Sequence, residues 1–303
     1  MVRFGQAVVG APGAGKSTYA KAIFNHILGQ NKDVAIINLD PAVSFPEATV
    51  DICTLVEHAD VMEELELGPN GALVYCMELL LENIDWLLAE IEKIPKSSYL
   101  VFDFPGQAEL YSVHDCVEKL VFQLQKNHIR LCAVYFTEAR HAANAHHFTA
   151  ALLATLSSML RLALPAVNVL SKLDVAPRLA ARLEVFTEPV DLERFFIDSS
   201  DDECDNEQTG RKRIKSRRRR IRERVSAQLA DVATSYGLVR FHPLVVTDEK
   251  LLQVVLSHAN SAIGMKIGDE DLLLAANRDA TFEFMGSTAF AQEEYIDKFH
   301  ERS

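Results

Sequence analysis

The segment from residue 10 to residue 17 carries the clearest chemistry in this sequence. It reads GAPGAGKS and fits the pattern GxxxxGK[ST], between an apolar run that predicts a strand and a periodic stretch that predicts a helix. Glycines let backbone N–H groups approach phosphate oxygens, and a helix N-terminus adds partial positive charge. We expect Lys16 to contact the β- and γ-phosphates of a nucleotide, Ser17 to coordinate Mg²⁺ and Thr18 to reach the α-phosphate. Further backbone contacts are expected from Gly13, Ala14 and Gly15.

A second motif, DFPGQ at residues 103–107, directly follows the apolar run 99–102. Asp103 is expected to hold Mg²⁺ through water at the end of a strand. The Gly106 N–H is expected to contact the γ-phosphate, which would make this loop a switch. Gln107 stands where a glutamine orients the attacking water in Ras-type GTPases. An ordinary turn is the alternative for this motif alone, and its place after a phosphate loop argues against that alternative.

A third motif, SKLD at residues 171–174, follows the apolar run 166–170. A fixed carboxylate accepts hydrogen bonds from guanine N1–H and the 2-amino group, a donor set that adenine lacks, so Asp174 predicts guanine selectivity. The stem of Lys172 is expected to pack on the base plane. Ser171 replaces the asparagine that usually begins this signature. A surface loop remains the alternative, although the order of the motifs argues against it.

Strands and helices that must position these motifs alternate along the chain. Continuous apolar runs are typical of strands buried on both faces of a parallel sheet. The pattern predicts an α/β fold, in which helices cover both faces of a mostly parallel sheet. The expected strands are 4–9, 33–39, 99–102, 131–136, 166–170 and 239–241, and the expected helices are 16–28, 51–65, 72–94, 115–126, 145–162 and 217–236.

Composition limits the class of protein. A chain of 303 residues, 49% of them apolar, can build a well-buried core, and we predict one domain over 1–265 and a C-terminal tail over 266–303. A net charge of -12 gives no reason to expect direct nucleic-acid binding. No apolar run approaches the roughly 20 residues that span a bilayer, and the N-terminus lacks a signal-peptide layout. The 5 scattered cysteines indicate reduced thiols, typical of a cytosolic or nuclear protein, and we predict a cytoplasmic one.

Charged and histidine-rich segments offer weaker signals. We predict a charged, disordered insertion at 199–220, and the basic run 211–224 is interpreted first as one face of a helix, with a localisation signal or an RNA contact left open. The adjacent His146 and His147 cannot both face one ion from a helix, so a polar loop is favoured over a metal site.

With these motifs in place, the tripeptide Gly68-Pro69-Asn70 makes the sequence resemble the GPN-loop GTPases, which are named after it. The segments 38–42 (NLDPA) and 107–110 (QAEL) resemble that family as well. The resemblance is clear from about residue 4 to residue 174 and fainter to about residue 263. It implies a P-loop α/β fold with a helical insertion that carries the GPN loop.

The same resemblance implies function. Members are homodimers or heterodimers with other GPN-loop GTPases, and Asn70 would contact the γ-phosphate or its product across the interface. The eukaryotic members assist assembly and nuclear import of RNA polymerase II, so shuttling to the nucleus is left open. The family suggests that Asp40 and Glu109 lie near the attacking water, and we do not choose among Asp40, Gln107 and Glu109 as the group that orients it.

Two further points stay open. The segment 241–246 (FHPLVV) stands where a guanine-contacting loop is expected, and Val245 could contact a base only through its backbone. The leading interpretation is a slow GTP-hydrolysing switch. The alternatives are an ATP-dependent P-loop kinase and a scaffold that holds nucleotide without hydrolysis.

Overall fold

The fold is built on a parallel sheet of 7 strands in the order β3-β2-β4-β1-β5-β6-β7. The computed structural model describes residues 2–175, 179, 183–187, 225, 228, 240–265 and 286–298. The predicted α/β fold with a mostly parallel sheet is confirmed. The strands are β1 (Arg3–Gly10), β2 (Val34–Asn38), β3 (Val50–Asp51), β4 (Tyr99–Asp103), β5 (Ile129–Glu138), β6 (Ala166–Ser171) and β7 (Phe241–Leu244).

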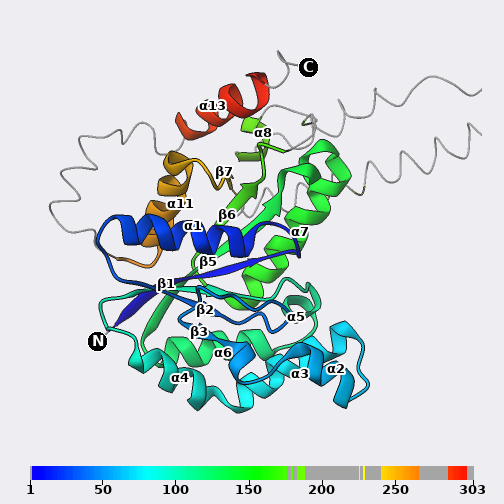
Figure 1. Ribbon diagram of the computed structural model, residues 1–303. Helices are drawn as coiled ribbons and strands as arrows, with labels where there is room; N and C mark the ends of the chain where they lie inside the picture. The colour runs from blue at the N-terminus through cyan, green and yellow to red at the C-terminus, as the bar shows by residue number, and fades with distance from the viewer. Residues whose placement is uncertain are drawn as a thin grey trace, which may run out of the picture.

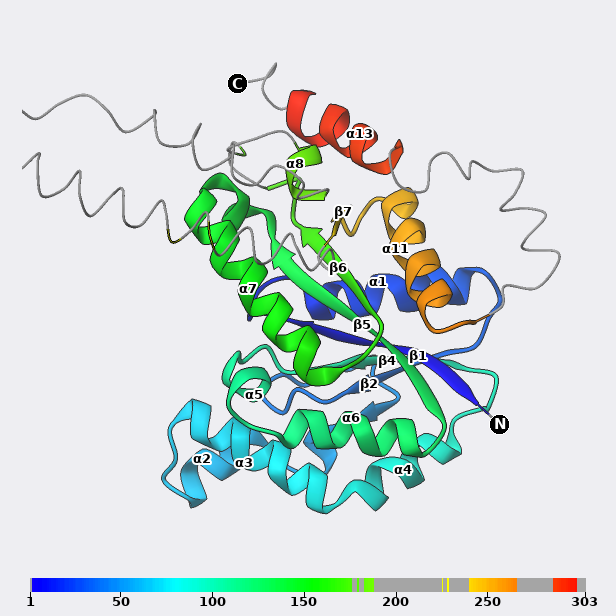
Figure 2. The same ribbon diagram turned by 180° about the vertical axis from the view of Figure 1, so that it is seen from behind.

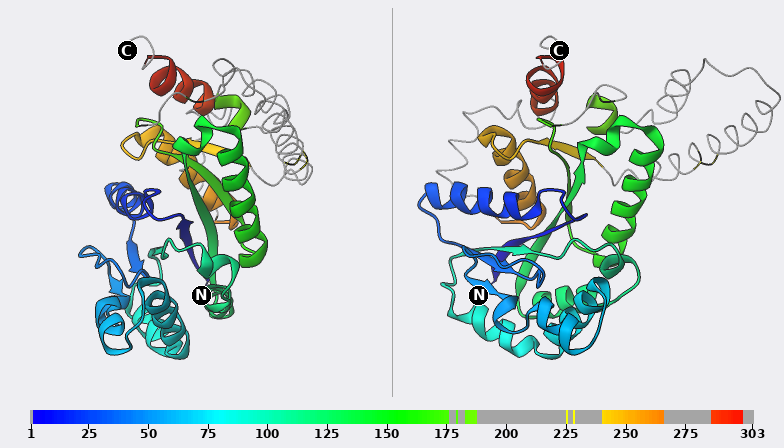
Figure 3. Two further views of the ribbon diagram at one scale, coloured as in Figure 1. Left: turned by 90° about the vertical axis from the view of Figure 1, so that its right-hand side faces the viewer. Right: turned by 45° about the vertical axis from the view of Figure 1, so that its right-hand side comes forward.

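Helices cover both faces of this sheet, as the views from front, back and side show (Figures 1, 2 and 3). On one face lie α1 (Lys16–Gly29) and α11 (Glu249–Ala262). The other face is covered by α3 (Pro69–Glu82), α4 (Ile84–Lys93) and α6 (Cys116–Lys126), with α7 (Ala145–Leu162) beside α6. Shorter elements are η1 (Ile52–Thr54), α2 (His58–Glu64), α5 (Glu109–Ser112), η2 (Ala139–Ala143), α8 (Leu183–Thr187), α13 (Ser287–Ala291) and a π-helical turn, η4 (Gln292–Asp297).

The core divides into two layers because strand side chains alternate between the faces. Val8 and Val134 point into the cluster under α1 and α11, whereas Ala7 and Ala133 point into the cluster under α3, α4 and α6. All four are 0% exposed. Burial on both faces explains why these strands read as continuous apolar runs, and it fixes the carboxyl edge of the sheet, where β1 and β4 end in the proposed phosphate motifs.

Two of the predicted helices were wrong in extent. Residues 51–65 are not one helix, because Asp51 ends β3 and its carboxylate accepts hydrogen bonds from the N–H groups of Phe45 and Cys53, which turns the chain into η1. The expected helix 72–94 is divided at Asn83, whose side-chain amide donates to Leu79 O at 2.9 Å and so competes with the helical pattern.

The C-terminal part holds structure that the sequence reading did not assign. The predicted strand 239–241 lies at Phe241–Leu244 instead, and α11 was not predicted. Within the region predicted as a tail, α13 packs on α8 and β7, and Gln292 Oε1 accepts a hydrogen bond from Leu183 N at 2.8 Å. The charged insertion at 199–220 and most of the expected helix 217–236 lie outside the described residues, so the domain boundaries stay predictions. Among the helices described, none is long and apolar enough to cross a membrane.

Candidate nucleotide-binding and hydrolysis site

The loop between β1 and α1 has the backbone conformation of a phosphate cradle. Gly13 and Gly15 have φ angles of 75° and 97°, in the left-handed region that side chains rarely adopt. Helix α1 begins directly after Gly15, at Lys16, and its first turn holds no acidic residue. The N–H groups of this turn and the positive end of the helix therefore meet at the loop, an arrangement that favours an anion.

Lys16 is buried inside this loop, with a relative exposure of 6%. Its Nζ donates to Ala11 O at 3.2 Å. Burial lowers the pKa of the ammonium, and the nearby charges of Asp103 and Asp40 raise it in part. The structure thus brings the predicted phosphate lysine and both of these predicted carboxylates into one electrostatic cluster.

Asp103 is the last residue of β4 and is 1% exposed. Burial raises its pKa to about 6, while a hydrogen bond from Ser17 and the charge of Lys16 oppose that shift. Its Oδ1 is buried without a hydrogen-bond partner. A carboxylate oxygen without a partner beside a serine hydroxyl supplies the hard oxygen ligands that Mg²⁺ takes, so these residues fit that ion.

Gly106 lies directly against the phosphate loop. A Cβ atom built on it would be 2.7 Å from Lys16 Nζ and 2.8 Å from Pro12 N, so only glycine fits in this arrangement. The neighbouring Gln107 has its Oε1 buried without a hydrogen-bond partner, whereas Glu109 is exposed at the start of α5. The structure therefore places Gln107 on the inner side of the loop and Glu109 on the outer side.

The loop that carries Asp40 is shaped by a side-chain network that the sequence reading missed. Asn38 Oδ1 accepts from Asp40 N at 3.1 Å, while Asn38 Nδ2 donates to Asp51 Oδ1 at 2.9 Å and to Val43 O at 2.8 Å. Asp40 Oδ1 accepts from Ala42 N at 3.0 Å, and burial raises the pKa of the Asp40 carboxyl. The polar Asn38 inside a buried strand was the signal available in the sequence.

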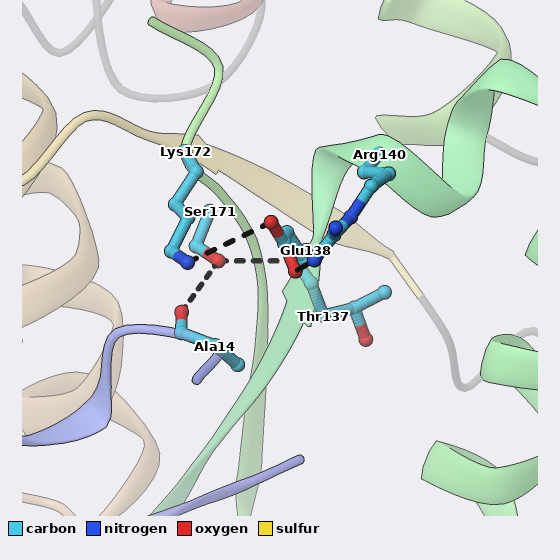
Figure 4. Close-up of polar contacts among 6 residues, drawn as sticks. All are labelled: Ala14, Thr137, Glu138, Arg140, Ser171 and Lys172. Carbon is cyan, nitrogen blue, oxygen red and sulfur yellow. Dashed lines mark hydrogen bonds and ion pairs between the residues drawn. The ribbon is translucent and has the colours of Figure 1, made fainter. Parts of the chain in front are cut away.

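Ser171 connects the third motif to the phosphate loop (Figure 4). Its Oγ lies 2.8 Å from Ala14 O and 3.3 Å from Thr137 O, and either carbonyl can accept its single hydrogen. Serine in place of asparagine therefore still ties β6 to the loop. Lys172 follows with φ 60°, and Asp174 lies exposed in the turn beyond it, where a base could reach it.

Two charged residues, Glu138 at the end of β5 and Arg140 in η2, were not predicted as part of the site. Glu138 lies 3.6 Å from Lys172 and 2.6 Å from Arg140, measured between oxygen and nitrogen atoms. Although burial raises the pKa of the Glu138 carboxyl, Arg140 and Lys172 together lower it below its usual value. The pairing of Glu138 with Lys172 had no local signal, because the ends of β5 and β6 are neighbours only in the folded sheet.

The GPN tripeptide and the segment 241–246 were also expected at the site. Gly68, Pro69 and Asn70 are exposed, with Gly68 in an extended conformation before α3 and Pro69 as its first residue. His58 Nε2 lies 2.8 Å from Pro69 O, which links α2 to this turn. Residues 241–244 form β7 rather than a loop, and Val245 is buried after it. A base contact by the backbone of Val245 stays a prediction.

An open pocket of about 650 Å³ adjoins the phosphate loop on the side of α7. Pro12 and Gly106 form part of its wall, opposite Ala151 and Ala154 of α7, and Tyr111 lines it as well. The Tyr111 hydroxyl donates to Pro105 O at 2.7 Å. The shape of this pocket therefore depends on the same segment that carries Gln107.

A phosphate loop between a strand and a helix, with an aspartate ending the neighbouring strand, defines a P-loop nucleoside triphosphatase. A family model described as "Conserved hypothetical ATP binding protein" matches residues 8–265. The chain is 39% identical over 305 residues to GPN-loop GTPase 2 of Xenopus laevis, which covers 98% of this chain and 91% of that one. It is also 38% identical over 253 residues to GPN-loop GTPase QQT1 of Arabidopsis thaliana, covering 82% and 80%. The chain belongs to the GPN-loop GTPase family.

Within the family, this chain is similar to GPN-loop GTPase 2 in more than one species. Identity to GPN-loop GTPase 2 of Danio rerio is 38% over 307 residues, covering 98% of this chain and 93% of that one. In the solved structures, the apo form of a GTPase from Pyrococcus abyssi matches with a TM-score of 0.62 at 23% identity, over 84% of this chain and 97% of that one. That match supports the fold.

Proposed function

We propose that this chain binds GTP with Mg²⁺, hydrolyses it slowly, and works as a dimeric conformational switch. The observation that carries the proposal is the cluster of Lys16, Asp103 and Asp40 at the phosphate loop, where each group acts on the pKa of another. Such a cluster of buried, perturbed charges at the carboxyl edge of a parallel sheet is typical of a reaction site.

Ser17 and Asp103 would hold the magnesium ion. Mg²⁺ usually takes one or two protein ligands and completes its shell with water and phosphate oxygens. The ion would neutralise charge that develops on the β- and γ-phosphates during transfer to water. Among the described residues no group of three or more His, Cys, Asp and Glu could hold a metal. Water and phosphate oxygens would therefore complete the shell that Ser17 and Asp103 begin.

Asp40 and Gln107 are the better-placed candidates for orienting the attacking water. The charge of Asp40 acts on Lys16, and Gln107 has a buried oxygen without a hydrogen-bond partner. Glu109 is exposed at the start of α5 and has no such buried oxygen. Gln107 Oε1 can accept a hydrogen bond from the water and so orient it, as a glutamine does in Ras-type GTPases.

Guanine selection is assigned to Asp174, with Lys172 packing against the base. The exposed turn that carries Asp174 follows β6, and Ser171 joins that strand to the phosphate loop at Ala14 O. A base held there would be fixed relative to the phosphates, because both contacts stem from one rigid edge of the sheet.

The dimer, the partner and the cellular role come from the family resemblance. The exposed Asn70 at the N-terminus of α3 is placed where it could reach another molecule, and its amide could donate to a γ-phosphate oxygen of a partner subunit. We propose homodimers or heterodimers with other GPN-loop GTPases, a role in assembly and nuclear import of RNA polymerase II, and a cytoplasmic protein that enters the nucleus with its cargo.

Two measurements test the proposal separately, one of nucleotide affinity and one of the hydrolysis rate. Purified full-length protein is titrated with GTP, GDP and ATP in the presence of Mg²⁺, and phosphate release is followed in single-turnover experiments. Tight GTP and GDP binding, weak ATP binding and release near 10⁻⁴ to 10⁻² per second support the proposal. Equal affinity for ATP would favour the kinase interpretation, and GTP binding with no phosphate release would favour a scaffold.

A further inference from the structure

We propose that Glu138 is a positioning residue for guanine recognition, which holds Lys172 beside the phosphate loop, and that Arg140 fixes Glu138 in turn. This inference rests on the proposed function, because it explains how the lysine of the base-recognition motif is kept in place. Glu138 itself is not expected to touch the nucleotide. Its expected effect on binding is transmitted through Lys172.

The geometry gives each oxygen of Glu138 a separate partner (Figure 4). Oε2 accepts a hydrogen bond from Arg140 Nη2 at 2.6 Å, and Oε1 lies 3.6 Å from Lys172 Nζ. The Glu138 side chain is 16% exposed, compared with 39% for Lys172 and 68% for Arg140. The Glu138 carboxylate is thus the least exposed member of a row of three charges, with Lys172 on one side and Arg140 on the other (Figure 4).

The sheet places this carboxylate at the base site. Glu138 ends β5 and is paired in register with Ser171 of β6, directly before Lys172. Thr137, the residue before Glu138, offers its carbonyl to Ser171 Oγ, whose other acceptor is Ala14 O of the phosphate loop. The backbone contacts and the ion pair therefore join the same two strand ends.

Lys172 needs such a restraint. Its φ of 60° lies in the left-handed region, which a residue with a long side chain seldom adopts. A free lysine side chain also populates many rotamers, and ordering them on binding a base would cost conformational entropy. A Cβ atom built on Gly15 would lie 4.0 Å from Lys172 Cε, so the restrained stem already runs past the loop that would hold the phosphates.

The Glu138 carboxyl is ionised at neutral pH, because its pKa is lowered. Arg140 and Lys172 together keep the pKa of the Glu138 carboxyl below its usual value in spite of burial. An isolated surface ion pair would contribute little, because solvent screens it and both side chains lose freedom. Here the expected benefit is pre-organisation of Lys172, which appears in nucleotide affinity more than in protein stability.

The experiment is a double-mutant cycle on GTP and GDP affinity, built from Glu138→Gln, Lys172→Met and the double variant. Glu138→Gln should weaken both nucleotides roughly threefold to tenfold. In the Lys172→Met background, the same change should have almost no effect, because the group through which Glu138 acts is gone. Arg140→Ala should produce a smaller loss of the same kind. Inosine triphosphate and ATP are titrated alongside.

Glu118→Gln is the matched control, since Glu118 also pairs with an arginine, Arg161, at 3.5 Å on the surface of α6 and α7. It should leave affinity unchanged. Additive effects of Glu138→Gln and Lys172→Met, or equal losses of ATP and GTP affinity in Glu138→Gln, would overturn the positioning role. If the wild type itself shows no preference for GTP over ATP, the proposed function fails instead, independently of the cycle.

Discussion

Gly106 and Lys16 are in such close contact that a Cβ atom on the glycine would lie 2.7 Å from the lysine Nζ. The same atom would be 2.8 Å from Pro12 N, which is backbone and cannot rotate away. The loop after β4 and the phosphate loop are therefore packed with no room for a methyl group. Because Gly106 is expected to contact the γ-phosphate, this packing couples the position of that loop to the lysine that holds the nucleotide.

Gly106→Ala should force the two loops apart. We expect the unfolding free energy to fall by about 1–3 kcal/mol, as for overpacking in a core, and GTP hydrolysis to fall at least about tenfold. Urea unfolding and single-turnover phosphate release measure both effects. Gly29→Ala is the control, because a Cβ atom there meets nothing within 4 Å. Unchanged hydrolysis in Gly106→Ala would show that the loop adopts another position with nucleotide bound.

The raised pKa of Asp103 predicts that the unfolding free energy falls with rising pH, the opposite of the usual effect of an aspartate. Its folded-state pKa of about 6 lies above the 3.8 of an unperturbed carboxyl, mainly because of burial. The folded state therefore binds the proton more tightly, and the stability contributed by this group falls as pH rises from about 4 to about 6. Above pH 6 the ionised group costs up to about 3 kcal/mol in protein without nucleotide.

Asp103→Asn should remove that cost and the magnesium site together. Relative to wild type, the variant should gain unfolding free energy as pH rises from 5.0 to 7.5, measured by urea unfolding without nucleotide. At pH 7.5 it should also lose the effect of Mg²⁺ on GTP affinity. Asp115→Asn, on the surface of the same protein, is the control. A constant difference in stability across this pH range would contradict the assignment of the pKa shift to Asp103.

Asn38 should matter for both folding and hydrolysis. It is 1% exposed and joins Asp40, Val43 and Asp51, so Asn38→Ala removes three hydrogen bonds that hold the loop after β2. We expect a loss of about 1–3 kcal/mol in unfolding free energy. We also expect hydrolysis to fall more than GDP affinity, because the loop carrying Asp40 loosens. Asn83→Ala, which removes one exposed hydrogen bond, should have a much smaller effect. Equal losses of hydrolysis and GDP affinity would indicate general misfolding instead.

The phosphate loop, the sheet and the order of the motifs could be predicted from sequence because their signals are local. A glycine-rich turn between a strand and a helix, or an aspartate directly after an apolar run, needs no knowledge of distant residues. The network of Asn38 with Asp51 and the pairing of Glu138 with Lys172 could not be predicted. Each depends on the register between strands, which becomes visible only after the sheet is assembled.

The predicted helix boundaries were wrong for a related physical reason. Periodic apolar residues continue through Asn83, and the break is set by one side-chain amide that bonds Leu79 O. Likewise Asp51 captures two backbone N–H groups and stops a helix that its neighbours would favour. A contact between Asn70 and a nucleotide could not be predicted from local pattern either, because an exposed turn carries no information on the molecule that it binds.

Asp174→Asn should change the base that the protein selects. The substitution removes a carboxylate that would accept two hydrogen bonds from guanine, at a cost of about 1.5–3 kcal/mol, or roughly tenfold to a hundredfold in GTP affinity. Xanthosine triphosphate carries a carbonyl where guanine has its amino group, so the new amide can donate to it and affinity should rise. Asp115→Asn serves as the surface control. Unchanged GTP affinity in Asp174→Asn would remove this residue from the base site.

Asn70→Ala should lower turnover by about tenfold or more while GDP affinity changes little, because its amide is expected to act on the γ-phosphate of a partner subunit. Mixing variants tests whether it acts across an interface. Asn70→Ala keeps an intact phosphate loop, and Lys16→Ala keeps an intact Asn70. Each variant alone should keep at most about a tenth of wild-type activity. Half of randomly assembled dimers would be mixed with one complete site each, restoring about a quarter of wild-type activity. No recovery, in mixtures shown by labelled subunits to exchange, would mean that Asn70 acts within its own chain or not at all.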